Sequence, residues 1–138
     1  MSDKAILTCA LTGVLTDPSM GNIPVTPEEM AEAAQQAWDH GATIVHCHFR
    51  DQRPGKGMMP TWDVDVVKSI IDAVRDRVPG MIINQSTGVM GPDISQPVAC
   101  MKATKPEMAA CNAGTLNYLK LKGDGTWAWP PLAFDNPV

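Results

Sequence analysis

Two histidines one residue apart give the sequence its strongest candidate for chemistry. His46 and His48 lie in Thr-Ile-Val-His-Cys-His-Phe-Arg-Asp at 43–51, which begins as an apolar, β-branched run and therefore predicts a strand. Alternate side chains of a strand share a face, so the two imidazoles would lie about 7 Å apart along it. Imidazoles at this spacing can bind one metal ion. Two structural histidines would give the same pattern, and the pattern alone leaves both interpretations open.

Further polar residues follow where this strand runs into a loop. Ligands of α/β proteins bind at the carboxyl ends of parallel strands, so a site is expected here. Arg50 could bind acyl-CoA or a carboxylate, but we favour a structural pair with Asp51. The remaining histidine, His40, falls at the end of a predicted helix, where a cation suits the helix dipole, and we interpret it as a cap.

The composition excludes several classes of function. The chain has 138 residues, a net charge of −4 and 44% hydrophobic residues, as expected for one globular domain. It has no basic run interleaved with aromatic residues and no apolar run near the roughly 20 residues of a membrane span, so we expect neither a nucleic-acid nor a membrane partner. Without a signal-peptide pattern, a cytoplasmic protein is expected. We interpret Cys9, Cys47 and Cys111 as small core residues.

Strand and helix patterns alternate along the chain. The first helix has complete end signals, with Thr26 as N-cap, Pro27 in the first turn, Glu29 in a capping box and Gly41 as a left-handed end. Strands are predicted at 5–11, 43–49, 81–85 and 108–111, helices at 27–40, 63–78 and 95–103, a loop at 112–117, and a fifth strand at 127–129.

This order predicts a parallel sheet with helical crossovers. The nearly continuous apolar run at 5–11 predicts a first strand that is covered on both faces. A (β/α)8 barrel needs about 250 residues. The chain is therefore either a compact α/β domain of four to five strands or the N-terminal half of a barrel.

A series of motifs, taken in chain order, favours the half barrel. The motifs are Ile-Leu-Thr-Cys-Ala-Leu-Thr-Gly at 6–13, Pro-Ser-Met at 18–20, Ile-Pro-Val-Thr-Pro-Glu-Glu at 23–29, the histidine stretch, Ile-Asn-Gln-Ser-Thr-Gly at 83–88, Lys-Pro-Glu-Met-Ala at 105–109, and Ala-Gly-Thr-Leu-Asn at 113–117. Together they resemble the β-keto acid cleavage enzymes, a family typified by 3-keto-5-aminohexanoate cleavage enzyme. The resemblance implies an α/β fold, the N-terminal portion of a (β/α)8 TIM barrel, with residues 1–138 as the N-terminal half of a single, truncated barrel domain.

The resemblance also implies an activity. Members of the family are zinc-dependent acyltransferases that cleave a β-keto acid with acetyl-CoA, giving acetoacetate and a new acyl-CoA, and they are homo-oligomers (tetramers). His46 and His48 would be two zinc ligands, while Ser86, Thr115 and Asn117 would bind the substrate. Zinc on neutral imidazoles is a Lewis acid for keto oxygens, and hydroxyl and amide groups orient a carboxylate. Without the family, a plain turn at 86–88 and ordinary loop hydrogen bonds at 115–117 are the favoured explanations of these residues.

Two departures from the family pattern matter. In aminohexanoate-cleaving members an acidic residue after the first strand reads the substrate's amino group, and Val14 takes its place here. A valine cannot pair with an ammonium group, so we predict a substrate with an uncharged or apolar tail. The resemblance places the third zinc ligand, a glutamate, and an acid–arginine pair for proton transfer in the C-terminal half. We therefore assign no catalytic residue in these 138 residues, and we expect the chain alone not to catalyse and, with two open sheet edges, to fold poorly.

Two other functions are compatible with the same residues. A zinc-dependent hydrolase on a TIM barrel would use the histidine pair to hold a zinc ion that activates water. A non-catalytic fragment would retain the fold without chemistry. Consumption of acetyl-CoA distinguishes the acyltransferase from the hydrolase. The non-catalytic fragment predicts a purified protein without metal, or with metal but without activity.

Overall fold

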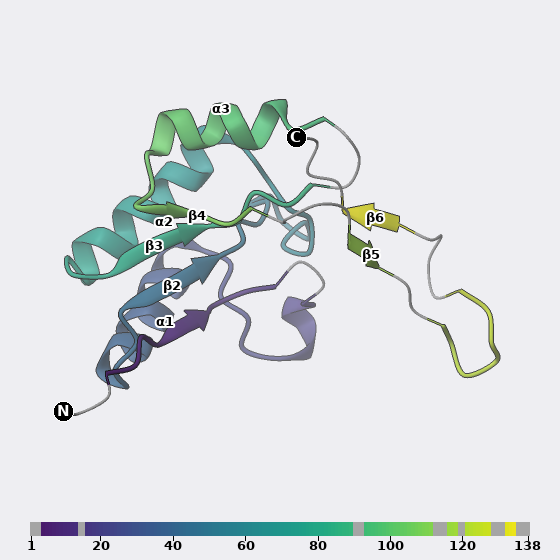
Figure 1. Cartoon of the computed structure of the whole chain (residues 1–138), viewed down its shortest axis with the longest axis horizontal. Coiled ribbons are helices and arrows are strands. Elements are labelled where there is room, and N and C mark those ends of the chain that lie inside the picture. The colour runs from purple at the N-terminus through teal and green to yellow at the C-terminus, as the bar shows by residue number, and fades with distance from the viewer. Residues whose placement is uncertain are drawn as a thin grey trace.

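A computed structural model describes residues 4–13, 16–89, 93–111, 116–118, 121–127 and 132–134. For residues 116–118 and 132–134 it describes the backbone only. The helices are η1 (Pro18–Met20), α1 (Pro27–Asp39), α2 (Val64–Arg77) and α3 (Ser95–Thr104). The strands are β1 (Thr8–Ala10), β2 (Ile44–Cys47), β3 (Ile82–Gln85), β4 (Met108–Ala109), β5 (Leu116–Tyr118) and β6 (Leu132–Phe134). The alternation predicted as far as β4 is confirmed (Figure 1).

The first four strands form one parallel sheet in the order β1-β2-β3-β4. The register places Ala10, His46 and Asn84 beside one another on three adjacent strands. Because all four strands run the same way, their carboxyl ends meet at one edge of the sheet (Figure 1). The fold is the α/β arrangement of a partial (β/α)8 barrel.

The main core lies between this sheet and its three long helices, which cover one face of the sheet (Figure 1). The strands contribute Val45, Cys47 and Ile83, each at most 1% exposed. The helices contribute Met30, Ala34, Val67, Ile70, Ile71, Val74 and Cys100. Burial of these apolar side chains is the main force that holds the sheet to the helices.

The predicted ends of α1 are confirmed. Thr26 Oγ1 accepts from the Glu29 amide (3.2 Å), and the Glu29 carboxylate accepts from the amides of Val25 and Thr26. These backbone hydrogen bonds lower the pKa of Glu29. At the other end His40 Nδ1 lies 2.7 Å from the Gln36 carbonyl oxygen, and Gly41 has φ +93°. The two ends stabilise the helix and fix where the chain enters β2.

The other face of the sheet is much less covered by the described residues. Its side chains include Ile6, Ile82 and Met108, which are 78%, 37% and 43% exposed. The prediction that residues 5–11 are covered on both faces is wrong, because the helices pack on one face only. Cys111, predicted to be a core residue, is exposed two residues beyond β4.

β5 and β6 form a separate, antiparallel two-stranded sheet. The prediction of a loop at 112–117 is therefore wrong at 116–117, which belong to β5, and residues 112–115 lie outside the described part. A fifth strand at 127–129 is also not found where the chain is described, since Trp127 forms only an isolated bridge with Leu121. A parallel neighbour needs a crossover of about a dozen residues, usually a helix, and the described residues after α3 contain none.

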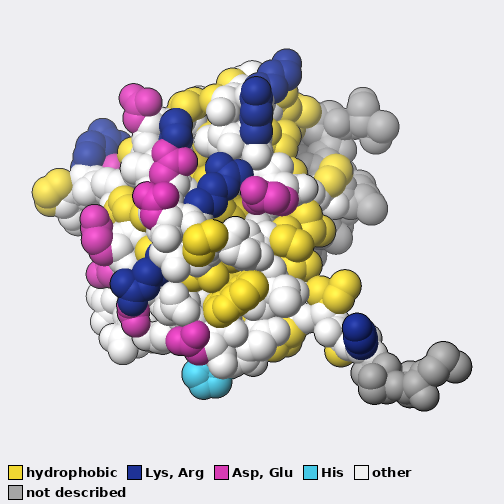
Figure 2. Space-filling view, turned by 90° about the vertical axis from the view of Figure 1, so that its left-hand side faces the viewer, with side chains coloured by type: hydrophobic (Ala, Val, Ile, Leu, Met, Phe, Trp, Pro, Cys, Tyr) yellow, Lys and Arg dark blue, Asp and Glu magenta, His cyan; other side chains and the backbone are white. Residues whose placement is uncertain are grey.

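The surface at the amino ends of the strands carries acidic and basic side chains close together (Figure 2). Ion pairs join neighbouring elements, with Arg77 of α2 bound to Glu32 of α1 (2.7 Å) and Arg75 bound to Glu107 (2.9 Å). Such exposed pairs contribute little stability individually. Within the described segments, every helix is too short or too polar to cross a bilayer.

Candidate functional site

β2 brings the two histidines together at the carboxyl edge of the sheet. Val45 and Cys47 point into the core, so His46 and His48 project from the opposite face. Their Nε2 atoms are 3.1 Å apart, their ring centroids are 4.9 Å apart, and the rings are inclined by 79°. Two neutral imidazoles at this distance can share one hydrogen, with one N–H donating to the other nitrogen's lone pair.

The same geometry fits a metal ion. Two imidazole nitrogens on a tetrahedral zinc ion lie about 3.3 Å apart, close to the separation found here. Burial, followed by the nearby His46 and Arg50, lowers the pKa of His48 to about 4, so this imidazole is neutral at neutral pH. Within the described ranges no group of three His, Cys, Asp or Glu side chains is placed to hold a metal. The described residues therefore provide two candidate nitrogen ligands for a metal ion, His46 and His48.

The end of β1 fixes the backbone of both histidines. The buried Thr12 hydroxyl donates to the His48 carbonyl oxygen (2.8 Å), and the Leu11 amide donates to the His46 carbonyl oxygen (3.1 Å). Sequence reasoning missed this role of Thr12. The only signal was a hydroxyl residue at the end of a strand, which is too common to be specific.

β3 adds polar groups on the same face. Ser86 is 5% exposed, and its amide donates to the Cys47 carbonyl oxygen (3.0 Å), which ties it to the strand that carries the histidines. Asn84 lies in register with His46, and its Oδ1 atom is buried with no hydrogen-bond partner in the described part of the chain. Sequence reasoning missed Asn84, although strand alternation places it on the face of Ser86.

A hollow of about 330 Å³ opens beside His48 and Ser86. Its walls come from the loops after β2 and β3 and from the start of α3. The other lining residues are Phe49, Pro60, Thr61, Trp62, Gly88, Val89, Asp93 and Gln96. Mixed apolar and polar walls of this kind suit a small organic ligand. Trp62 and Asp93 were not predicted, because only folding brings their loops to the histidine strand.

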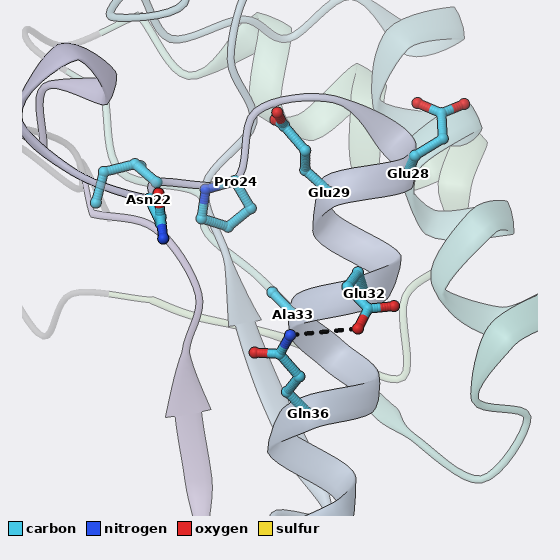
Figure 3. Close-up of a pocket in the computed structure, with 8 residues that line it drawn as sticks. Asn22, Pro24, Glu28, Glu29, Glu32, Ala33 and Gln36 are labelled. Carbon is cyan, nitrogen blue, oxygen red and sulfur yellow. Dashed lines mark hydrogen bonds between the residues drawn. The ribbon is translucent and has the colours of Figure 1, made fainter.

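A larger hollow, of about 510 Å³, lies along α1 and carries three glutamates (Figure 3). The Glu29 carboxylate is bound to the backbone amides before α1, and Glu32 is bound to Arg77 and accepts from Gln36 Nε2 (3.2 Å), the contact drawn in Figure 3. These carboxylates serve the helix and its neighbours, so we do not assign chemistry to this hollow.

The remaining predicted site residues have different outcomes. Val14 and Thr115 lie outside the described residues, and Asn117 lies in β5, where only the backbone is described. The predicted pair of Arg50 with Asp51 is wrong. Asp51 pairs with Arg53, while Arg50 turns inward and donates to backbone carbonyls. The side chain of Arg50 is buried, at 1% exposure, between the loops after β1 and β2.

The parallel sheet defines an α/β protein of the barrel type, and the polar groups at its carboxyl edge form a candidate ligand site at the strand ends. The sequence profile of the beta-keto acid cleavage enzyme family matches residues 4–138, and the chain belongs to that family.

Individual relatives agree with this assignment. The chain is 34% identical to the 3-keto-5-aminohexanoate cleavage enzyme of Acetoanaerobium sticklandii, over 84% of this chain and 41% of that protein. It is 32% identical to the 3,5-dioxohexanoate:acetyl-CoA acetone transferase of Paraburkholderia graminis, over 83% of this chain and 36% of that protein. The apo structure of ObcA matches it with a TM-score of 0.62 and 25% identity, over 84% of this chain and 26% of that chain. The chain thus spans less than half the length of these relatives.

Proposed function

We propose that this chain provides the zinc- and substrate-binding strands of an enzyme that cleaves a β-keto acid with acetyl-CoA. The observation that carries the proposal is the convergence of His46 and His48 Nε2 atoms, 3.1 Å apart, on the open face of the sheet. Family membership supports the reaction class, and the two relatives are named for cleavage of a 3-keto acid and for a transfer between a 3,5-dioxo acid and acetyl-CoA.

In this reaction the acyl group of the β-keto acid moves to the CoA sulfur. The acetyl group of acetyl-CoA moves to the carbon left next to the carboxylate, so the products are acetoacetate and a new acyl-CoA. His46 and His48 would hold the metal through their Nε2 atoms. A bound zinc ion supplies Lewis acidity toward a keto oxygen. The Ser86 hydroxyl, with Thr115 and Asn117, orients the substrate carboxylate by hydrogen bonds.

We further propose that residues 1–138 act as the N-terminal half of one barrel domain. Catalytic zinc normally has three protein ligands, and the described residues offer two. The glutamates Glu107, Glu29 and Glu32 are engaged elsewhere, since Glu107 binds Arg75, Glu29 caps α1 and Glu32 binds Arg77. The third ligand and the proton-transfer groups are then supplied by protein outside these residues.

The substrate tail is proposed to be uncharged or apolar. Val14 replaces the acid that would pair with an amino group, and the hollow beside His48 has Phe49, Pro60 and Trp62 on its walls. A panel of β-keto acids tests this in the catalytically complete protein. Preference for the amino-substituted acid over an alkyl-substituted acid of equal length would contradict it.

Metal binding is tested by titrating the purified chain with Zn²⁺ in a calorimeter. We expect His46→Ala and His48→Ala each to weaken binding by at least about tenfold, because each removes one of two ligands. His40→Ala is the matched control, since this histidine caps α1 and should leave the affinity unchanged. Equal Zn²⁺ affinity in all three variants would show that His46 and His48 do not bind the metal.

Catalysis is tested by assaying the same chain for formation of acetoacetate from acetyl-CoA and a β-keto acid. We expect zinc binding without turnover, because the described residues lack a third ligand and a placed proton-transfer group. Turnover by the purified 138-residue chain would show that the proposed division of the site between two halves is wrong.

A further inference from the structure

Arg50 has the largest of the fully buried side chains in the described part of the chain, and its hydrogen bonds go to uncharged oxygens. Arg50 as a whole is 1% exposed. Nη1 donates to the Met58 carbonyl oxygen (2.6 Å). Nη2 donates to the carbonyl oxygens of Gly13 and Thr16 and to Thr16 Oγ1, the last two at 3.2 Å and 2.8 Å. The Nε atom is buried with no partner in the described residues.

This burial is expensive and is not offset by an ion pair. Asp51, the adjacent carboxylate, is bound to the exposed Arg53 instead. A buried charge without a paired carboxylate is unfavourable, and neutral acceptors repay its lost hydration only in part. A medium-sized apolar side chain would fill the same space at lower cost, so stability alone does not account for an arginine here.

The positions of the carbonyl oxygens that accept from Arg50 show which segments its guanidinium joins. Gly13 and Thr16 belong to the loop after β1, whereas Met58 belongs to the loop after β2. Arg50 itself follows His48 by two residues. Among the described residues, the Asp51 amide and the Met59 carbonyl oxygen (2.9 Å) bind the β2 loop to itself. One further link between the two loops lies farther along, where Gln52 Nε2 donates to the Val25 carbonyl oxygen (2.8 Å). The planar, rigid fork of an arginine can fix carbonyl groups from two segments in one orientation.

We propose that Arg50 is a positioning residue that fixes the loop after β1 to the loop after β2 beside the histidine pair. The loop after β1 contains Val14, the residue that the proposed function assigns to the substrate tail, and in this respect the inference rests on that function. Arg50 sets how Gly13 and Thr16 of the loop after β1 lie relative to the strand that carries the histidines. It does so without contacting metal or substrate.

The first test measures loop order directly, by hydrogen–deuterium exchange of the metal-free chain. In Arg50→Met we expect faster exchange at residues 11–17 and 56–60 and unchanged exchange in α2. Arg50→Lys keeps the charge but lacks the fork, so it should behave like Arg50→Met. Arg53→Met is the matched control, because this arginine is exposed and should leave both loops unchanged. Unchanged exchange in both loops of Arg50→Met, or full protection restored by lysine, would overturn the proposal.

A second variant covers the case in which Arg50→Met does not fold. Thr16→Val removes the side-chain acceptor of the fork together with the hydrogen bonds between the Thr16 hydroxyl and the Gly13 backbone. We therefore expect faster exchange at residues 56–60 as well as at 11–17, and no change in the core strands, because loss of the Gly13 contacts alone would affect only the loop after β1. If exchange rises equally throughout the chain, Arg50 and Thr16 contribute general stability only, and the inference is wrong.

A binding measurement separates positioning from a general structural role. With acetoacetate as the probe on the zinc-loaded chain, Arg50→Met should weaken acetoacetate binding by about tenfold, as expected for a misplaced contact. The affinity for Zn²⁺ itself should not change, because both imidazoles and their anchors remain. Parallel loss of Zn²⁺ and acetoacetate affinity would contradict a positioning role. If the wild type binds no Zn²⁺, the proposed function fails, and the exchange experiment still decides the role of Arg50.

Discussion

The two faces of the four-stranded sheet differ in almost every property. Toward the helices, Val45, Cys47 and Ile83 are almost completely buried in an apolar core. Toward the open side, the same strands carry the half-buried His46 and Asn84 at one end and the partly exposed Ile82 at the other. One face therefore provides most of the packing, and the other face carries the candidate chemistry.

This separation follows from strand alternation. A shift of one residue along β2 or β3 moves a side chain from the core to the site. Neighbouring positions can therefore be substituted to test stability and metal binding independently. The open face also exposes apolar side chains such as Met108. The described sheet ends in two edge strands, β1 and β4.

The largest expected effect concerns two adjacent isoleucines of β3. Ile83→Ala should lower the free energy of unfolding by about 2–5 kcal/mol, because it leaves a cavity in the core. Ile82→Ala, on the open face, should cost less than about 1 kcal/mol. Urea unfolding of both variants makes the comparison. Equal costs would mean that the open face is packed as tightly as the core in solution.

An intermediate effect is expected at Thr12, which binds the backbone of His48. Thr12→Val removes the hydroxyl that holds the His48 carbonyl and should cost about 1–2 kcal/mol of stability. We also expect Zn²⁺ affinity to fall by about tenfold, as for other groups that support a metal ligand. Thr12→Ser retains the hydroxyl and should restore both values in unfolding and calorimetric measurements. A normal Zn²⁺ affinity in Thr12→Val would show that His48 needs no support from β1.

The smallest effect is expected at the cap of α1, remote from the histidines. Thr26→Ala should lower the unfolding free energy by about 1 kcal/mol, because it removes the acceptor for the Glu29 amide. Zn²⁺ affinity should stay at the wild-type value, and Thr26→Ser should retain most of the stability. A change in Zn²⁺ affinity would show that the helical layer and the site are more strongly coupled than the two-face comparison suggests.

Local signals made the helices and the parallel order of β1–β4 predictable. The capping box at Thr26 and the glycine at 41 each act within a few residues, and each is found as predicted. The errors arise where the outcome depends on distant parts of the chain. Residues 5–11 are apolar on both faces, but whether a layer covers each face cannot be read from the strand itself.

The candidate site shows the same division. Alternation alone placed His46 and His48 on one face, and it could have added Asn84. It could not find Trp62 or Asp93, which reach the hollow beside His48 through loops whose paths depend on packing. It also misassigned Arg50, because the choice between an adjacent carboxylate and distant carbonyl groups depends on where the loop after β1 lies.

The sequence by itself determined which side chains share a strand face, where the helices begin and end, and the family to which the chain is similar, because these depend on short-range periodicity and residue order. Only the tertiary structure decided that one sheet face stays open, that the imidazole nitrogens converge to 3.1 Å, and that Arg50 is buried between two loops. These features depend on contacts between segments that are distant in sequence, and their energies are set by packing and desolvation that no local pattern records.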